Sequence, residues 1–244
     1  RHALSSAVRT QDFVWGTLGR FAIPATGLIP PGILGHDPGR RQPHLAREKA
    51  VEMVRASQLP LPIRLRAAVH PILLNQYAAL TQALFRVWED LSVEVEVVTK
   101  TMPEFLESWH ATQGIDVMLG RWIADYDDPD NFTFTLFHSG TGAARSYFAS
   151  PETDRILEEA RGEARPAARE ALYRKFEHAL LDPAILVPLF HDVDYRIGSP
   201  RVRGLQLRST APHVNYAELG KAEAPARQAA PERQTGGGTL QVPI

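Results

Sequence analysis

A dense group of carboxylates follows a short apolar run near the middle of the chain. Residues 121–132 contain four aspartates together with Trp122 and Tyr126. The preceding run, residues 115–119, predicts a buried strand, and Pro129 predicts the start of a helix. Carboxylates at this density repel one another and hold water, while an indole beside them offers a flat apolar wall. The segment therefore predicts a site that meets a cation or an amine.

Calcium is the first cation to consider, because Asp125, Asp127 and Asp130 loosely follow the spacing of a calcium loop. Such a loop needs Gly at its sixth position and a bidentate Glu at its twelfth. This chain has no Gly at the sixth position, and Leu136 occupies the twelfth. The histidines show no short metal-binding spacing either. We therefore expect no metal site and no cofactor.

A catalytic reading rests on His191 and Asp192, which follow a predicted strand. No serine in a G-x-S-x-G setting accompanies them, and that setting is what an esterase of this type requires. We therefore expect a binding protein and no enzyme. A hydrolase built around the two residues stays open as an alternative, and broad esterase and peptidase screens would test it.

Composition narrows the class of protein. The chain has 244 residues, 44% of them hydrophobic and 23% charged, with a net charge of −1 and no cysteine. Those values predict a soluble globular chain, exclude disulfides and thiolate chemistry, and give no electrostatic reason to bind nucleic acid. No apolar run approaches the roughly 20 residues of a membrane span.

Strands and helices are predicted to alternate around the acidic segment. Residues 93–98 alternate at period two, and residues 74–91 carry one apolar stripe at helical spacing. The predicted strands are 63–69, 93–98 and 115–122, and the predicted helices are 45–57, 74–91 and 103–112. This order implies a parallel or mixed sheet with right-handed crossovers. Further on, two helices begin at Pro151 and Pro166, and short strands are predicted at 185–190 and 195–198.

An ordered series of motifs connects these elements to a known family. The motifs are Arg1 to Val8, Ile29-Pro30-Pro31-Gly32, Trp122 to Asp130, Ser150-Pro151-Glu152-Thr153-Asp154, Ala171-Leu172-Tyr173, and Val187 to His191. In this order they resemble the carboxy-terminal half of the peptide- and nickel-type solute-binding proteins of ABC importers, known as solute-binding protein family 5. The resemblance covers residues 1–218.

The resemblance implies an α/β, periplasmic-binding-protein-like lobe with a mixed sheet flanked by helices, in an incomplete two-lobed protein. Residues 1–198 would form the second, carboxy-terminal ligand-binding lobe. Residues 199–220 would return toward the missing first lobe. Residues 221–244 lie beyond the resemblance, and their lack of periodicity predicts a disordered tail. The implied partners are a peptide or small-molecule ligand, the missing amino-terminal lobe and an ABC permease. The implied location is periplasmic, or extracellular and membrane-associated.

Members that bind dipeptides and oligopeptides hold the ligand's ammonium group with the Asp of a W-x-x-D segment. That Asp corresponds to Asp125 and the Trp to Trp122, which would line a pocket, and Tyr77 is a further candidate ligand contact. Oligopeptide binders place an Arg three residues before the Trp, where this chain has Leu119. Arg121 adjoins the Trp, but strand alternation predicts that it faces the other way. The usual anchor for a ligand carboxylate is therefore not visible.

The main prediction is a lobe that binds a peptide or another amine-bearing small molecule. Because one lobe supplies only half the contacts, we expect the chain alone to bind peptides weakly or not at all. Micromolar binding in calorimetry would contradict this expectation. The alternative is a ligand-sensing domain of a larger regulatory protein, which would be cytoplasmic.

Overall fold

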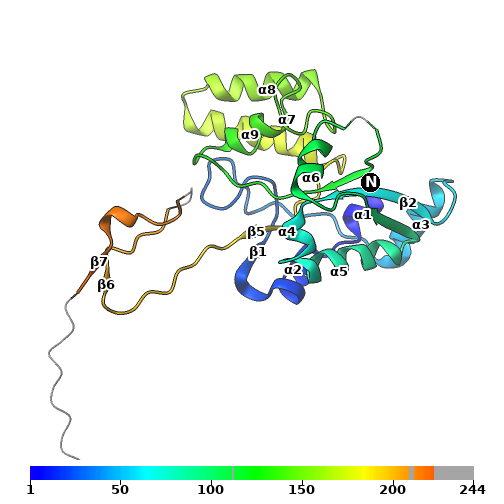
Figure 1. The fold of residues 1–244 in the computed structure, drawn as a ribbon. Helices are drawn as coiled ribbons and strands as arrows, with labels where there is room; N and C mark the ends of the chain where they lie inside the picture. Colours follow the sequence, from blue (N-terminus) through cyan, green and yellow to red (C-terminus); the bar gives the residue numbers. More distant parts are fainter. Residues whose placement is uncertain (112, 209–211, 223–244) are drawn as a thin grey trace, which may run out of the picture. The chain divides into compact units, whose positions relative to one another are not determined.

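The computed structural model describes residues 1–111, 113–208 and 212–222, which form two compact units (Figure 1). The first unit is Arg1–Asp194 and the second is Tyr195–Ile244. The domain division predicted after residues 198 and 220 stays a prediction. Of the predicted tail, residues 223–244 lie outside the described residues.

A three-stranded parallel sheet lies in the first unit, in the order β3-β2-β4. Strand β2 is Ile63–Val69, β3 is Val93–Val97 and β4 is Val117–Leu119. Parallel neighbours need a crossover, and helices supply it: α4 (Pro71–Leu74) and α5 (Ala78–Glu89) before β3, and α6 (Met102–Ser108) before β4. The predicted alternation of strands and helices is confirmed.

Strand β4 is shorter than the predicted 115–122. It pairs only with residues 67–69 of β2, and the last rung is the His70 amide donating to the Leu119 carbonyl at 2.9 Å. Pro71 follows, and proline has no amide hydrogen to continue a ladder. The chain from Gly120 onward is therefore released from the sheet into the acidic segment.

The two faces of the sheet differ in polarity, as the period-two pattern predicts. Val93 and Val95 face a core formed with α1 (His2–Ser6), α3 (Arg47–Ala56) and α5. The other face carries ion pairs between neighbouring strands: Arg64 with Glu94 at 3.3 Å and Arg66 with Asp116 at 3.0 Å. The hydrophobic effect thus fixes which face of the sheet meets α1, α3 and α5.

A second core lies among the helices that follow the acidic segment. Helices α8 (Pro151–Gly162) and α9 (Pro166–Leu181) pack side by side, with the short α7 (Phe134–Phe137) against them (Figure 1). Helix α8 begins at Pro151, as predicted, and Ser150 caps it. The fully buried side chains of this core include Leu157, Tyr173, Phe176 and Leu180.

A short antiparallel pair joins distant parts of the first unit. Strand β1 (Ala22–Pro24) pairs with β5 (Phe190–Asp192), and α2 (Thr10–Leu18) with the 3-10 turn η1 (Gly19–Phe21) leads into β1. The predicted strands at 185–190 and 195–198 are wrong, because the structure has its strand at 190–192. Pro188 cannot donate to a ladder, and β1 offers only three residues for pairing.

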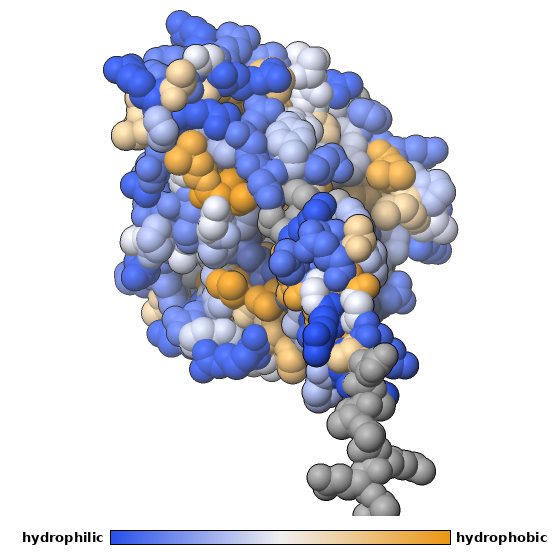
Figure 2. All heavy atoms as spheres, turned by 90° about the vertical axis from the view of Figure 1, so that its left-hand side faces the viewer, coloured by the Kyte–Doolittle hydropathy of each residue, from blue (hydrophilic) through white to orange (hydrophobic). Residues whose placement is uncertain are grey.

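The second unit is small. Strands β6 (Val202–Arg203) and β7 (Gly220–Lys221) pair antiparallel, and a 3-10 turn, η3 (Tyr216–Glu218), lies between them in the sequence. Among the described residues, no helix has both the length and the hydrophobicity to cross a membrane. The face drawn in Figure 2 is mostly hydrophilic, and its hydrophobic residues lie in small groups.

Candidate ligand-binding site

The carboxyl edge of the parallel sheet gathers the residues that the sequence singles out. His70 follows β2, and Arg121 and Trp122 follow the adjacent β4, so these residues leave the sheet at the same edge. The acidic segment continues from there to Asp125 and beyond. In open α/β sheets ligands bind in the crevice outside this edge, at the point where the strand order reverses. Here the order β3-β2-β4 places that point at β2.

Asp128 has a structural role. Its carboxylate caps the 3-10 turn η2 (Pro129–Asn131) by accepting from the Asp130 amide at 2.9 Å. Arg169 of α9 donates to both carboxylate oxygens of Asp128, at 2.7 and 2.8 Å. Burial alone would raise the pKa of Asp128, but the bonds from Arg169 and the Asp130 amide outweigh it, and the net pKa is lowered. Asp128 thus caps the turn that begins at Pro129, where the sequence predicts the start of a helix.

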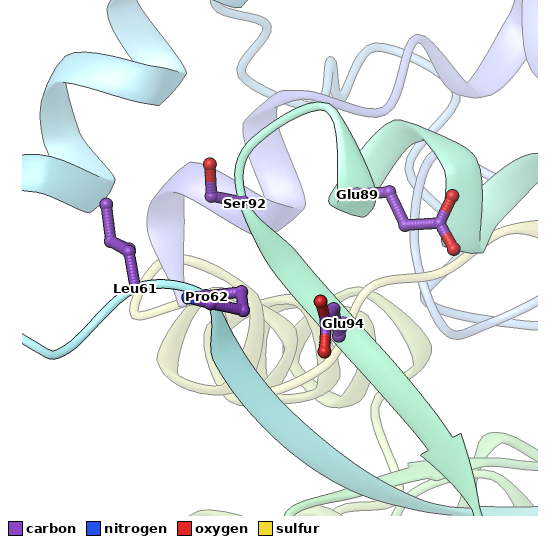
Figure 3. A pocket seen from close by; sticks show the side chains of 5 residues that line it. All are labelled: Leu61, Pro62, Glu89, Ser92 and Glu94. Atoms are coloured by element: carbon purple, nitrogen blue, oxygen red, sulfur yellow. The ribbon is translucent and has the colours of Figure 1, made fainter.

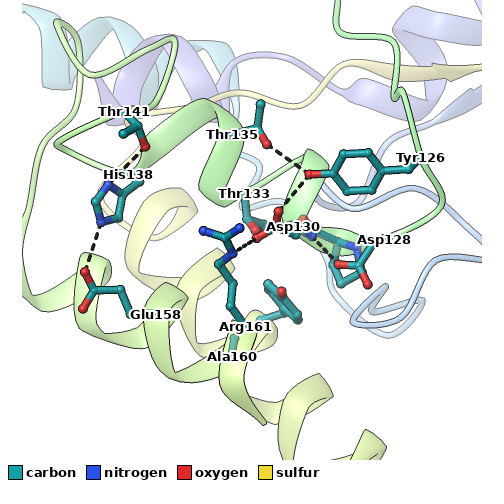
Figure 4. Close-up of polar contacts among 12 residues, drawn as sticks. Tyr126, Asp128, Asp130, Thr133, Thr135, His138, Thr141, Glu158, Ala160 and Arg161 are labelled. Carbon is teal, nitrogen blue, oxygen red and sulfur yellow. Dashed lines mark hydrogen bonds and ion pairs between the residues drawn. The ribbon is translucent and has the colours of Figure 1, made fainter. Parts of the chain in front are cut away.

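Asp130 is also neutralised within the fold (Figure 4). Tyr126 donates to its Oδ2 at 2.8 Å, and Arg161 Nε lies 3.1 Å from its Oδ1. The second contact is an ion pair by distance but lacks hydrogen-bond alignment. The Arg161 guanidinium also lies over the Phe134 ring, 4.0 Å from its centroid. Asp130 therefore ties the acidic segment to α8.

Asp125 differs from both. Its side chain is exposed, and within the described residues no hydrogen bond or ion pair engages its carboxylate. The neighbouring Trp122 is held in place: its Nε1 donates to Asn131 Oδ1 at 2.8 Å, and its half-buried ring packs on the core of α7, α8 and α9. The structure thus leaves the Asp125 carboxylate available, three residues after a fixed indole.

Tyr77 belongs to a separate polar group at the same edge. Its hydroxyl donates to Asp192 Oδ1 at 2.8 Å, and Arg121 Nη2 lies 2.9 Å from Asp192 Oδ2. Burial, together with the bond to Asp192, raises the pKa of Tyr77 to about 12. We call Tyr77, Arg121 and Asp192 the Asp192 cluster. It joins the start of α5, the end of β4 and the end of β5.

Two histidines lie near members of this cluster in the sequence, His70 before Tyr77 and His191 before Asp192, and both are neutral at pH 7. Burial, with a smaller effect of the Arg121 charge, lowers the pKa of His70. Burial also lowers the pKa of His191 to about 4, and its Nε2 is buried with no partner in the described part of the chain. Of the residues in the Asp192 cluster, sequence reasoning proposed Tyr77 but missed the pair of Arg121 and Asp192. Their separation of 71 positions leaves no local signal.

Two other observations bear on the site. Within the described ranges, no three His, Asp or Glu side chains are grouped so that they could hold a metal ion. A hollow of about 600 Å³ lies between Leu61, Pro62, Glu89, Ser92 and Glu94 (Figure 3). It sits where β2 and β3 begin, at the opposite edge of the sheet from the acidic segment. We therefore do not assign the ligand to it.

Comparison with known proteins decides the relationship. The periplasmic oligopeptide-binding protein OppA of Escherichia coli is 32% identical over 48% of this chain and 21% of its own length. A dipeptide-binding protein of Pseudomonas aeruginosa is 24% identical over 88% of this chain and 41% of its own length. The chain is a relative of the peptide-type solute-binding proteins. This confirms the relationship predicted from the ordered motifs.

The fold agrees with the sequence relatives. The solved structure of HbpA2 from Haemophilus parasuis matches 91% of this chain and 44% of its own with a TM-score of 0.75, at 19% identity. The predicted periplasmic-binding-protein-like fold is confirmed. No family model matches the chain. The chain spans less than half the length of the solute-binding proteins that it matches here.

Proposed function

We propose that this chain is the carboxy-terminal ligand-binding lobe of an ABC-importer solute-binding protein. Its ligand would be a peptide or another small molecule that carries an amine. Its partners would be an amino-terminal lobe and an ABC permease, and it would act outside the cytoplasm. The named relatives are binding proteins, which supports this function over the regulatory alternative and over a hydrolase. One observation carries the proposal: the exposed carboxylate of Asp125, without a partner in the described residues, in the segment that leaves the carboxyl edge of the sheet after β4.

The roles of the three residues follow from their surroundings. An ammonium group would make a charge-assisted hydrogen bond with Asp125, which is stronger than a neutral one. Trp122, fixed by Asn131, would supply a flat wall for the apolar part of the ligand. Tyr77 would contribute its ring, because its hydroxyl already bonds to Asp192.

We expect weak binding of a short peptide by the 244-residue chain, with a dissociation constant in the millimolar range, since one lobe leaves the ligand half in water. A titration followed by amide and indole NMR resonances measures such affinities. The Asp125 amide and the Trp122 indole signal should shift together. Substitution Asp125→Asn should weaken binding by about tenfold, the factor expected for a lost charge-assisted bond.

Asp90→Asn is the matched control, because Asp90 is exposed at the end of α5 and pairs with Arg47. It should leave the peptide affinity unchanged. Equal affinities for the wild-type chain and Asp125→Asn would contradict the role of Asp125. Shifts confined to residues around the hollow in Figure 3 would place the ligand elsewhere.

A further inference from the structure

The charged side chains at and after the carboxyl edge of the sheet are not all paired. Arg169 neutralises Asp128, and Arg161 neutralises Asp130. Arg121 follows β4 and is paired with Asp192. Asp125 is left over as a carboxylate with no partner in the described part of the chain. After these pairings the edge offers a ligand a negative charge and no matching positive one.

Arg121 is the cation nearest in sequence to Asp125, and it is already occupied. Its side chain and that of Asp192 are about equally exposed, at 32% and 33%, so the pair lies at the surface where a ligand could reach it. A ligand carboxylate approaching Arg121 would meet the Asp192 carboxylate 2.9 Å from the guanidinium and be repelled by it. The pair as a whole has no net charge and therefore no net attraction for an anion.

Other cations at this edge do not replace Arg121. His70 follows β2, and its lowered pKa keeps it neutral at pH 7. Lys100 follows β3 on the far side of β2, and its own neighbour is Glu104, which accepts from the Lys100 amide at 2.6 Å. The Tyr77 hydroxyl, a possible donor to an anion, donates to Asp192 instead.

The dimensions suit this arrangement to a short ligand. Arg121 and Asp125 are four residues apart, so their Cα atoms lie at most about 14 Å from each other. A ligand of two to four residues that is held by its amine at Asp125 could therefore bring its other end to the Asp192 cluster. The charges of that cluster then decide whether a terminal carboxylate on the ligand strengthens binding.

We propose that Asp192 is a built-in carboxylate that occupies Arg121 and Tyr77, so that this lobe selects its ligand by the amine and is indifferent to the ligand's own carboxylate. The inference rests on the proposed function and deepens it by naming the ligand class. Peptide amides and amines without a carboxyl group bind the lobe as well as free peptides do.

The test uses one tripeptide, trialanine, in three forms: free, with a carboxy-terminal amide, and with an acetylated amino terminus. Each is titrated into the 244-residue chain and followed by NMR. The free and amidated forms should bind within threefold of each other, because neither gains from Arg121. The acetylated form should bind at least tenfold more weakly, because it has no ammonium for Asp125.

Asp192→Asn should create a preference that the wild-type chain lacks. The substitution removes the competing charge and frees Arg121, so the free peptide should bind at least fivefold more tightly than its amide. The double variant Asp192→Asn, Arg121→Met should lose that preference again. Asp116→Asn is the matched control: it also unpairs an arginine, Arg66, but at the other end of β4, and the two peptides should remain equal.

The outcomes separate the inference from the function on which it rests. If the wild-type chain prefers the free peptide over its amide by more than threefold, the inference is wrong although the proposed function stands. The same holds if folded Asp192→Asn binds both forms equally. The pKa of Tyr77, measured in parallel, should fall in this variant, because the Asp192 carboxylate helps to raise it, and that fall reports that the cluster was altered. If none of the three peptides shifts any resonance, the millimolar peptide binding proposed for this chain fails, and the inference fails with it.

Discussion

Replacing Glu177 by alanine is expected to lower the free energy of unfolding by about 2–4 kcal/mol. Glu177 lies on α9 and is 2% exposed, and its Oε1 accepts from the amides of Leu28 and Ile29 at 2.5 and 2.9 Å. Without it, two amides in the Pro- and Gly-rich loop lose their acceptor, and a buried donor without a partner costs about 1–3 kcal/mol. Urea unfolding followed by circular dichroism measures the loss.

Glu177→Gln is the matched control, because its amide oxygen can take the place of Oε1 for both donors. We expect its stability at pH 7 to stay within about 1 kcal/mol of the wild-type value. A loss as large as that of the alanine variant would show that the negative charge, and not the acceptor, holds the loop. Gly27 permits this contact, since a Cβ there would lie 2.7 Å from Glu177 Oε1.

The pH dependence of these variants has a definite sign. Burial raises the pKa of Glu177, although the two amides and the charges of Arg40 and His36 act against it. The folded state thus binds the proton more tightly than the unfolded chain, so the stability due to this group is fully present below about pH 4.5 and falls as pH rises. The free energy of unfolding of Glu177→Gln, relative to that of the wild type, should therefore increase from pH 4 to pH 7.

Local patterns were sufficient to predict the sheet and most helices. Alternation in 93–98 and the stripe in 74–91 reflect burial on one face, which is a property of neighbouring residues. The strand at β5 was misplaced because its position depends on β1, more than 160 residues earlier in the chain. A two-stranded pair of three residues each carries almost no periodicity of its own.

The site could be predicted only in part for a similar reason. Trp122 and Asp125 stand out because they belong to a dense local segment and to a family motif. The roles of Asp128 and Asp130 depend on Arg169 and Arg161, which come from helices later in the chain. The role of Arg121 follows only from its ion pair with Asp192, which is distant in the sequence. Sequence alone thus located the carboxylates, and the fold determined which of them are neutralised.

Arg169 should be the residue whose loss most weakens the acidic segment. It donates to both oxygens of Asp128, to the Ala160 carbonyl at 3.0 Å and to the Tyr173 hydroxyl at 3.1 Å. Breaking a buried ion pair by removing one partner costs about 3–5 kcal/mol, and this pair is partly exposed, so we expect about 2 kcal/mol for Arg169→Met. Chemical unfolding at pH 7 measures this difference in stability.

Arg47→Met is the same substitution in an exposed pair, with Asp90 at 3.3 Å, and should change stability by about 0.5 kcal/mol or less.

The lowered pKa of Asp128 adds a second test. A carboxyl with a lowered pKa stabilises the fold above its unfolded value of about 3.9, and this contribution is lost as pH falls through the folded pKa. The cost of Arg169→Met should therefore shrink between pH 7 and pH 3. A cost that is equal at pH 7 and pH 3 would mean that Arg169 acts through its packing on Tyr173 and its hydrogen bond to the Ala160 carbonyl. The Asp128 charge would then contribute little to holding the acidic segment.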